Sequence, residues 1–458
     1  MSGSNTTRAE IAHALPFGWT VARLGELGRY LNGRGFKKSE WGTVGRPIIR
    51  IQDLTGTGET PNYFDGEVED RHVVRWGDFL ISWAATLGAF IWHGVEGVLN
   101  QHIFKVESFI NRGFHYYAVL NGIEDMYARS RGTGMVHIVK GDFDATMVPL
   151  PPLAEQERIA DRIDELFTDL SAGVAALERV KRNLSRYRAA VLHAAVTGRL
   201  VTSTSVDWTH EAKWKPLGTI IGKIEQGWSP KCEREPASDD SEWAVMTTTA
   251  IQPMRFDGYE NKRLPEHLEP TPQYEVCLGD MLITRAGPRS RCGITCLVRE
   301  CRRRLILCDK AYRFRCMDDR AIPEYVELAL NARPITDAIE RMKTGSSDSG
   351  LNLTQTRVRS LRLPVPPKAT QSAIVTAVQE KVSQIDALEA EVERGLKRSG
   401  RLRQAILKAA FEGKLVPQDP NDEPASALLE RVRADAASTN RTSPRTRRRR
   451  SSRKAASK

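Results

Sequence analysis

Apolar residues recur at alternating steps of three and four along two long stretches of the chain. This spacing is typical of a coiled-coil seam, and charged residues fill the outer positions. Each stretch opens after a proline pair, at 151–152 or 366–367, and stops near Gly198 or Gly413, as helices commonly do. A helix of about 40 residues spans roughly 60 Å. The predicted seam residues are Ile159, Ile163, Leu166, Leu170, Leu177, Leu184, Ile374, Val378, Ile385, Leu388, Val392 and Leu402.

The second stretch repeats the first at an offset of 215 residues (364 − 149). The proline run at 149–152 returns at 364–367, and the closing segment at 188–201 returns at 403–416. A repeat of this length indicates a duplicated structural unit. Because each apolar seam needs a partner, we expect the helices to pack as an antiparallel pair with Gly395 facing Leu170. The alternative is two long surface helices of a globular fold.

Two segments of similar size and layout lie between the helices. Both carry a Gly-Asp pair before a strand-like run, at 77–78 and 279–280. Short β-type runs separated by Gly, Pro and Asn, with helices predicted over 116–127 and 323–342, indicate mixed domains. We predict an α+β fold: two mixed α/β domains separated by two long helices packed as an antiparallel coiled coil, with a pseudo-two-fold repeat. The predicted segments are an N-terminal extension at 1–14, a first domain at 15–148, a first spacer helix at 149–205, a second domain at 206–363, a second spacer helix with a C-terminal segment at 364–434, and a basic disordered tail at 435–458.

Charge and cysteine content indicate which partners the chain could bind and in which compartment it is expected. The formal net charge is +11, but nine of these charges lie between 441 and 458, which leaves about +2 (11 − 9) for the body. Such a tail binds polyanions nonspecifically, so specific binding must come from the body. We find no membrane-length apolar run and no signal peptide, and we expect a cytoplasmic protein that does not associate with a membrane. Of the seven cysteines, the five at 292–316 are expected to be buried thiols rather than zinc ligands.

Loops of both domains carry residues suited to nucleic acid. Three cations surround the glycines at 33 and 35, and three arginines flank a Gly-Pro pair within 284–291; both arrangements suit phosphates and guanine edges. Amide, imidazole and charged groups follow strand-like runs at 100–102 and 309–310. Taken singly, each residue fits a solvated surface as well. The DNA-binding candidates are Arg34, Lys37, Lys38, Trp83, Gln101, His102, Arg131, Gln226, Arg285, Arg289, Arg291, Lys310 and Lys343.

Four features occur together: the two proline pairs, the run Pro-Leu-Pro-Pro-Leu-Ala-Glu-Gln at 149–156, the duplicated Ala-Ala-x-x-Gly-[Arg/Lys]-Leu-Val ends and the two Gly-Asp segments. In this combination the chain resembles the specificity subunits of type I restriction-modification systems. The resemblance covers the chain from about Pro16 to Ala434. The second copy departs from the common pattern at 368–370, where Lys-Ala-Thr replaces the Leu-Ala-Glu of 153–155.

The resemblance implies a non-catalytic subunit that binds a specific DNA sequence. In that family, two target-recognition domains each read one half of a split site on double-stranded DNA. The helix pair holds these domains apart and docks two modification (methyltransferase) subunits. The resemblance also implies that this chain binds no cofactor itself. S-adenosylmethionine, and ATP and Mg for restriction, are expected on partner subunits, and whether restriction subunits join stays open.

Missing motifs disfavour an enzyme. The sequence has no [Asn/Asp]-Pro-Pro-[aromatic] motif for adenine methylation, no Gly-rich S-adenosylmethionine loop after a strand and no GxxxxGK[ST] phosphate loop. A fused single-chain restriction-modification enzyme is therefore disfavoured. The main alternative is a coiled-coil scaffold whose two domains bind proteins without reading DNA. Duplex binding by the body without its tail, falling steeply with salt, would separate the two interpretations.

Overall fold

The chain forms two compact units, and each contains one mixed domain and part of both long helices. The computed structural model describes residues 15–58, 60–130, 140–201, 214–345 and 347–442. Unit 1 combines Met1–Ala175 with Leu396–Lys458, and unit 2 is Ala176–Gly395. The long helices were predicted to be spacers separate from the domains, but their ends are part of the domain cores. The predicted extension at 1–14 and the tail beyond 442 lie outside the described residues.

Domain 1, in unit 1, is built on two four-stranded sheets. The first has the order β2 (Gly28–Asn32), β9 (Ile103–Ser108), β6 (Phe79–Ser82), β7 (Gly88–Ile91), with all neighbours antiparallel. The second has the order β4 (Tyr63–Phe64), β3 (Arg46–Ile49), β8 (Gly97–Leu99), β5 (Val73–Val74), with β3 and β8 parallel. Helix α3 (Arg112–Ser130) packs against β7. The remaining elements are β1 (Thr20–Arg23) paired with β10 (Met147–Leu150), and the short helices α2 (Ile51–Thr55) and α4 (Lys140–Asp144).

Domain 2, in unit 2, repeats this plan. Its four-stranded sheet has the order β12 (Glu225–Gln226), β21 (Ala311–Phe314), β17 (Met281–Thr284), β19 (Thr295–Leu297). Its second sheet has the order β16 (Asn261–Arg263), β13 (Ala244–Met246), β20 (Leu305–Ile306), and β13 and β20 are parallel. Two-stranded pairs are β11 (Lys215–Pro216) with β23 (Arg362–Leu363), β14 (Ile251–Gln252) with β15 (Arg255–Phe256), and β18 (Ala286–Gly287) with β22 (Leu351–Asn352). The predicted likeness of the two domains is confirmed.

The helix predicted over 323–342 is two helices. α6 (Pro323–Asn331) ends before Ala332, whose backbone is extended, and α7 (Arg333–Met342) begins after it. Pro334 explains the break, because proline has no N–H to donate to the carbonyl four residues earlier and is tolerated in the first turn of a new helix, where it lies in α7. A further short helix, α8 (Gln355–Ser360), precedes β23.

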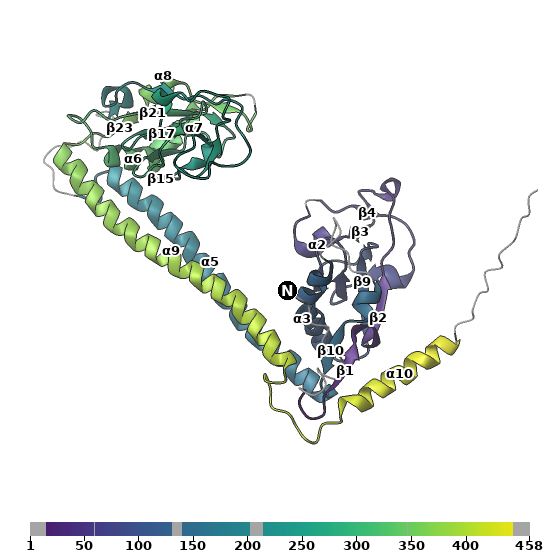
Figure 1. Cartoon of the computed structure of the whole chain (residues 1–458). Helices are drawn as coiled ribbons and strands as arrows, with labels where there is room; N and C mark the ends of the chain where they lie inside the picture. The colour runs from purple at the N-terminus through teal and green to yellow at the C-terminus, as the bar shows by residue number, and fades with distance from the viewer. Residues whose placement is uncertain (1–14, 59, 131–139, 202–213, 346, 443–458) are drawn as a thin grey trace, which may run out of the picture. The chain divides into compact units, whose positions relative to one another are not determined.

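The two long helices, α5 (Leu153–Val196) and α9 (Lys368–Phe411), run antiparallel within each unit (Figure 1). In unit 1 the start of α5 and the end of α9 enter the core of domain 1, where Ile163 and Phe411 are buried. In unit 2 the end of α5 and the start of α9 enter the core of domain 2, where Val196 and Ile374 are buried. The predicted antiparallel pair is therefore confirmed.

The seam prediction was wrong for Leu388 and Leu402, whose side chains are 52% and 47% exposed. Gly395 faces Leu177, one heptad from the expected Leu170: a Cβ at Gly395 would lie 3.0 Å from a Leu177 methyl. The physical reason is that a single partner helix covers only one flank of each seam. Ile385 and Val392, on the covered flank, are buried.

The last helix, α10 (Ala425–Thr442), reaches into the segment expected to be a disordered tail from 435. Its apolar face, including Leu428 and Leu429, is buried against the core of domain 1. The N–H of Ala425 donates to the backbone oxygen of Gly18 (2.9 Å). The C-terminal segment thus completes the domain with which the chain begins.

Candidate nucleic-acid interface

The same backbone crossing ends the central sheet of both domains. Gly33 follows β2 and Gly227 follows β12. A Cβ at Gly33 would lie 2.1 Å from the backbone oxygen of Asn100, and one at Gly227 would lie 1.9 Å from that of Leu307. Only glycine allows two backbones to approach this closely. These glycines therefore mark equivalent places in the two domains.

Each crossing packs on a tight turn that leads into the next strand. In the turn 100–103 the fourth N–H donates to the first carbonyl (3.2 Å), and the turn 308–311 has the same bond (3.2 Å). The third residue of each turn accepts from the strand beside it, from Trp83 N in domain 1 (3.3 Å) and from Arg285 N in domain 2 (2.8 Å). We name these places the strand-end sites. Strand-end site 1 comprises Asn32–Arg34, Trp83 and Gln101–His102; strand-end site 2 comprises Gln226–Trp228, Arg285 and Asp309–Lys310.

Strand-end site 1 brings together four of the predicted candidates. The indole of Trp83 donates to the side-chain oxygen of Asn32 (3.1 Å), and its ring meets the edge of His102 at a centroid distance of 5.2 Å. The carboxamide of Gln101 is exposed and lies 3.2 Å from the His102 ring nitrogen. Together with Arg34, these groups offer aromatic, amide and imidazole chemistry at one edge of the sheet.

The loop after Gly33 contains one held cation and two open ones. Arg34 lies over two phenylalanine rings, 4.8 and 4.9 Å from their centroids, and forms an ion pair with Glu40. Hydrogen bonding from the backbone of Lys37, followed by the charge of Arg34, lowers the pKa of the Glu40 carboxyl. The side chains of Lys37 and Lys38 are exposed and make no ion pair with any described residue. These two lysines remain available to phosphate.

Strand-end site 2 holds three predicted candidates of more basic character. The Nε of Arg285 donates to the backbone oxygen of Asp309 (2.8 Å), and its guanidinium lies 5.6 Å from the centroid of the Tyr312 ring. Gln226 on β12 and Lys310 in the turn are exposed. The two domains therefore present different side chains on one backbone design.

A groove of about 470 Å³ beside strand-end site 2 contains cations that sequence reasoning missed. It is lined by Lys231, Lys262 and Lys310 together with the hydroxyl residues Thr247 and Thr248. Among the residues that the structure describes, none of these lysines forms an ion pair. The sequence spacing could have indicated Lys231, because it lies four residues after Gly227, as Lys37 does after Gly33. This comparison is possible only once the two glycines are known to be equivalent.

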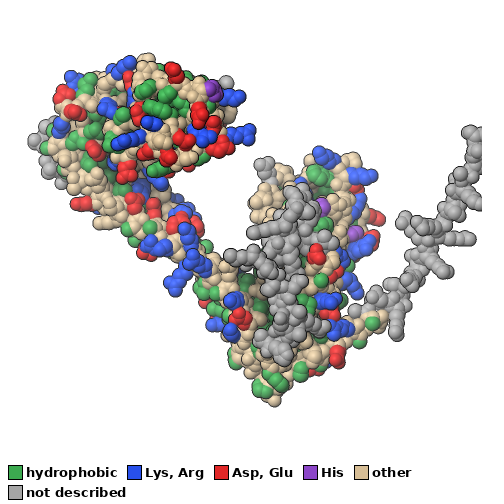
Figure 2. All heavy atoms as spheres, in the orientation of Figure 1, with side chains coloured by type: hydrophobic (Ala, Val, Ile, Leu, Met, Phe, Trp, Pro, Cys, Tyr) green, Lys and Arg blue, Asp and Glu red, His purple; other side chains and the backbone are tan. Residues whose placement is uncertain are grey.

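Other predicted candidates are held by the protein itself. Arg289 pairs with Glu340 and Asp348, and Lys343, 7% exposed, also pairs with Glu340. The Arg291 guanidinium donates to backbone oxygens of 248 and 251. Basic and acidic side chains are interspersed on the visible surface of domain 2 (Figure 2), so internal pairing decides, cation by cation, which charges are open. Arg131 lies outside the described residues.

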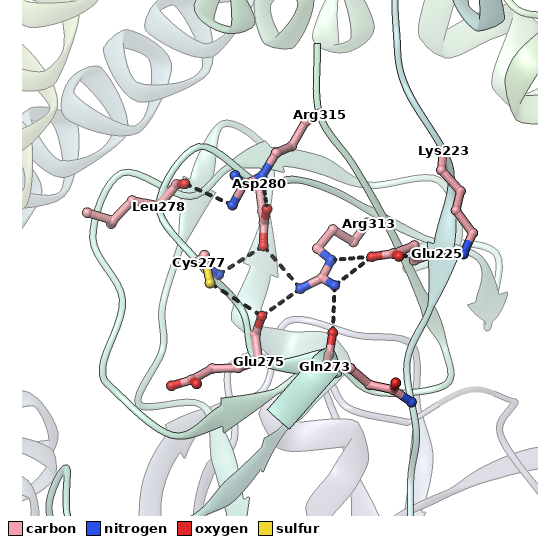
Figure 3. A network of polar contacts seen from close by, with 9 residues as sticks. All are labelled: Lys223, Glu225, Gln273, Glu275, Cys277, Leu278, Asp280, Arg313 and Arg315. Atoms are coloured by element: carbon pink, nitrogen blue, oxygen red, sulfur yellow. Dashed lines mark hydrogen bonds and ion pairs between the residues drawn. The ribbon is translucent and has the colours of Figure 1, made fainter. Parts of the chain in front are cut away.

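A charged network holds the opposite end of the same strands. In domain 2 the buried Asp280 carboxylate pairs with Arg313 (3.5 Å), which also pairs with Glu225 (2.6 Å) (Figure 3). The hydrogen bond from Arg313 lowers the pKa of Glu225. Domain 1 has a smaller version, in which Asp78 pairs with Lys105 (2.9 Å). The Gly-Asp pairs thus fix the beginning of β6 and β17, while the strand-end sites lie after the ends of these strands.

The cysteines are free thiols. Cys292, Cys296 and Cys308 are buried as expected, whereas Cys301 and Cys316 are partly exposed. Burial raises the pKa of the Cys308 thiol to about 11. Within the described ranges, no group of three or more His, Cys, Asp or Glu side chains has an arrangement that could hold a metal ion. The described helices also include none that is both long and apolar enough to cross a bilayer.

Comparison with known proteins gives one consistent family. The family described as "Type I restriction modification DNA specificity domain" matches residues 16–179. The type I restriction enzyme EcoEI specificity subunit of Escherichia coli is 36% identical over 199 residues, covering 43% of this chain and 34% of that protein. The EcoBI specificity subunit of Escherichia coli is 27% identical over 454 residues, covering 92% of this chain and 93% of that protein. The match thus spans about a third of the first relative and nearly all of the second.

A solved structure shares the fold. It is the one described as "Structural basis underlying complex assembly and conformational transition of the type I R-M system"; it is 18% identical and has a TM-score of 0.64, covering 87% of this chain and 99% of that one. By sequence, the chain is similar to the specificity subunits of type I restriction-modification systems, with a family match over residues 16–179 and one relative aligned over nearly its whole length.

Proposed function

We propose that each domain reads one half of a bipartite site on double-stranded DNA through its strand-end site. One observation carries this proposal: the two sites share a backbone but differ in side chains. Site 1 has Trp83 and the pair Gln101–His102, and site 2 has Arg285 and the pair Asp309–Lys310. A shared backbone lets both sites approach a groove in the same way, while different side chains select different bases.

The helix pair would set the distance between the two half-sites. Each long helix has 44 residues, which corresponds to about 66 Å if straight. Ion pairs join the helices within unit 2, from Lys181 to Glu393 (2.5 Å) and from Arg188 to Glu389 (2.9 Å). A braced pair suits a spacer better than a single helix, because it resists bending.

We further propose that the chain docks two modification subunits. One supporting feature is an exposed apolar flank of the helix pair in unit 2, formed by Val180, Tyr187 and Leu388, which are 43%, 49% and 52% exposed. Val180 and Tyr187 each precede a paired residue, Lys181 or Arg188, and are therefore rotated by about 100° around the helix axis from it. The apolar residues thus lie on the flank of the seam opposite to the ion pairs. Large exposed apolar groups in a row are typical of a protein interface.

A second supporting feature is a groove present in both units where the edge strand, the domain helix and a long helix meet. The groove of unit 1, about 560 Å³, includes His93 and Asp164; that of unit 2, about 280 Å³, includes Arg299 and Gln379. These pairs are equivalent: Asp164 and Gln379 are 215 apart, as the repeat requires (379 − 164), and His93 and Arg299 each lie two residues after the edge strand. Equivalent grooves suit two copies of one partner.

Charge placed in each groove tests this docking. We expect Asp164→Arg to remove one modification subunit from the assembly and Gln379→Arg to remove the other, as counted by native mass spectrometry. The matched controls Asp161→Arg and Thr376→Arg alter exposed residues on the same helices that do not line the grooves, and should retain both copies. Unchanged stoichiometry in both groove variants would refute this placement.

In this proposal the chain contributes recognition rather than catalysis. S-adenosylmethionine would bind the modification subunits, and ATP and Mg would serve restriction subunits where these join. The complex would act in the cytoplasm, where chromosomal and incoming DNA are both accessible.

Exchanging residues 15–148 for the corresponding domain of a relative tests the central proposal. Mapping of modified bases should then show one half of the split site replaced and the other half kept. Loss of both halves would contradict independent reading. Absence of any salt-dependent duplex binding by the assembled complex would instead favour the protein-binding scaffold.

A further inference from the structure

The two strand-end turns carry different hydrogen-bonding groups at equivalent positions. The second and third residues are Gln101 and His102 in domain 1, and Asp309 and Lys310 in domain 2. A carboxamide has both an acceptor and donors. The carboxylate of Asp309 only accepts, and the ammonium of Lys310 only donates. The backbone therefore presents a mixed group in one domain and separate acceptor and donor groups in the other.

The structure positions the Gln101 side chain in domain 1 and the backbone of Asp309 in domain 2. In domain 1 the Gln101 carboxamide lies over Gly35, where a Cβ would come within 2.6 Å of its oxygen, so the glycine makes room for it. In domain 2 the backbone of Asp309 is fixed on both sides: its N–H donates to the Ser229 hydroxyl (3.0 Å), and its oxygen accepts from Arg285 (2.8 Å). No described residue pairs with the Asp309 carboxylate or the Lys310 ammonium. Both groups remain free for a ligand.

These patterns complement different base pairs. In the major groove adenine presents an acceptor and a donor, which one carboxamide can match in a bidentate contact. A G·C pair presents two acceptors on guanine and a donor on cytosine. A cation beside a carboxylate complements the major-groove edge of a G·C pair, because the cation donates to guanine and the carboxylate accepts from cytosine.

We propose that Gln101 reads adenine of an A·T pair in the first half-site, and that Asp309 and Lys310 together read a G·C pair in the second. Lys310 donates to guanine, and Asp309 accepts from the amino group of cytosine. This assignment rests on the proposed function, in which each strand-end site faces one half-site. Lys231 and Lys262, in the groove beside the turn, contact phosphates and carry no base information.

The test transplants one turn. The full chain, co-expressed with its modification subunits, carries Asp309→Gln with Lys310→His, so that the turn of domain 2 acquires the residues of domain 1. Sequencing of modified bases across the genome should show one G·C position of the second half-site change to A·T or lose its preference by roughly 5- to 150-fold. The first half-site should stay the same. Lys310→Arg should retain guanine, because arginine makes the same contact.

Lys231→Gln is the matched control: it should weaken modification of all sites alike and leave every letter unchanged. The inference is overturned if the transplanted turn also weakens all sites alike without changing a letter, or if the unaltered half-sites lack the expected A·T and G·C pairs. The proposed function itself would be refuted by a different result: an unaltered complex that modifies no split site. The two failures are therefore distinguishable.

Discussion

Replacing Lys231 and Lys262 by glutamine should reduce DNA affinity through two lost phosphate contacts. Both lysines line the groove beside strand-end site 2, and neither pairs with a described residue. A lysine that neutralises one phosphate contributes about 0.9 to the slope of log K against log salt. The double variant should therefore have a slope smaller by about 1.8, which corresponds to an affinity loss of roughly 30-fold at 0.15 M salt.

Fluorescence anisotropy of a labelled duplex, titrated with the assembled complex at several KCl concentrations, measures this slope. Arg289→Gln is the control: it removes a cation that the protein already pairs with Glu340 and Asp348. Its slope should match that of the unaltered chain. An unchanged slope in the double variant, or an equal reduction in the control, would refute the rule that internally unpaired cations are the ones that contact phosphate.

Three further outcomes follow from the cores. Burial lowers the pKa of His115 to about 3, below the value of about 6.5 for an unfolded chain, so the stability contributed by neutral His115 is complete above pH 6.5 and falls by roughly 1.4 kcal/mol per pH unit below it. His115→Phe should therefore reduce the pH dependence of the urea midpoint of unit 1 between pH 6.5 and 5. An unchanged pH dependence would contradict this. Replacing Arg313 and Arg315 together by alanine leaves Asp280 buried without either ion-pair partner and should destabilise unit 2 by about 3–5 kcal/mol in urea unfolding. Deleting 418–458 removes α10 and should increase hydrogen exchange in domain 1 while leaving domain 2 unchanged.

The repeat and the heptad spacing were sufficient to predict the helices, their antiparallel pairing and the two similar domains. These features are local or periodic, so the order of residue types encodes them directly. Exposure of Leu388 was not predictable in this way, because it depends on which flank of the seam the partner helix covers.

The candidate site was predicted only in part, because pairing between distant residues decides which cations are open. Arg289 looked suited to phosphate until Glu340, 51 positions away, was seen to neutralise it. Lys231 was missed because its place in the groove depends on the backbone crossing at Gly227, and the carbonyl that it crosses belongs to Leu307. Recognising equivalent positions in two diverged domains requires these long-range contacts.

The spacer proposal gives a deletion whose effect can be worked out from the packing. Leu177 faces Gly395, so removing 177–183 together with 389–395 deletes one heptad from each helix and keeps the remaining seam layers in register. Seven residues correspond to about 10 Å of helix, or about three base pairs of duplex.

Mapping of modified bases should then show the same half-site letters separated by about three fewer base pairs. Deleting only 177–183 is the control: it shifts α5 against α9 and should impair assembly rather than yield a new spacing. If the matched deletion assembles and modifies DNA at the original spacing, the helix pair does not determine the separation, and the distance must be set by the partner subunits.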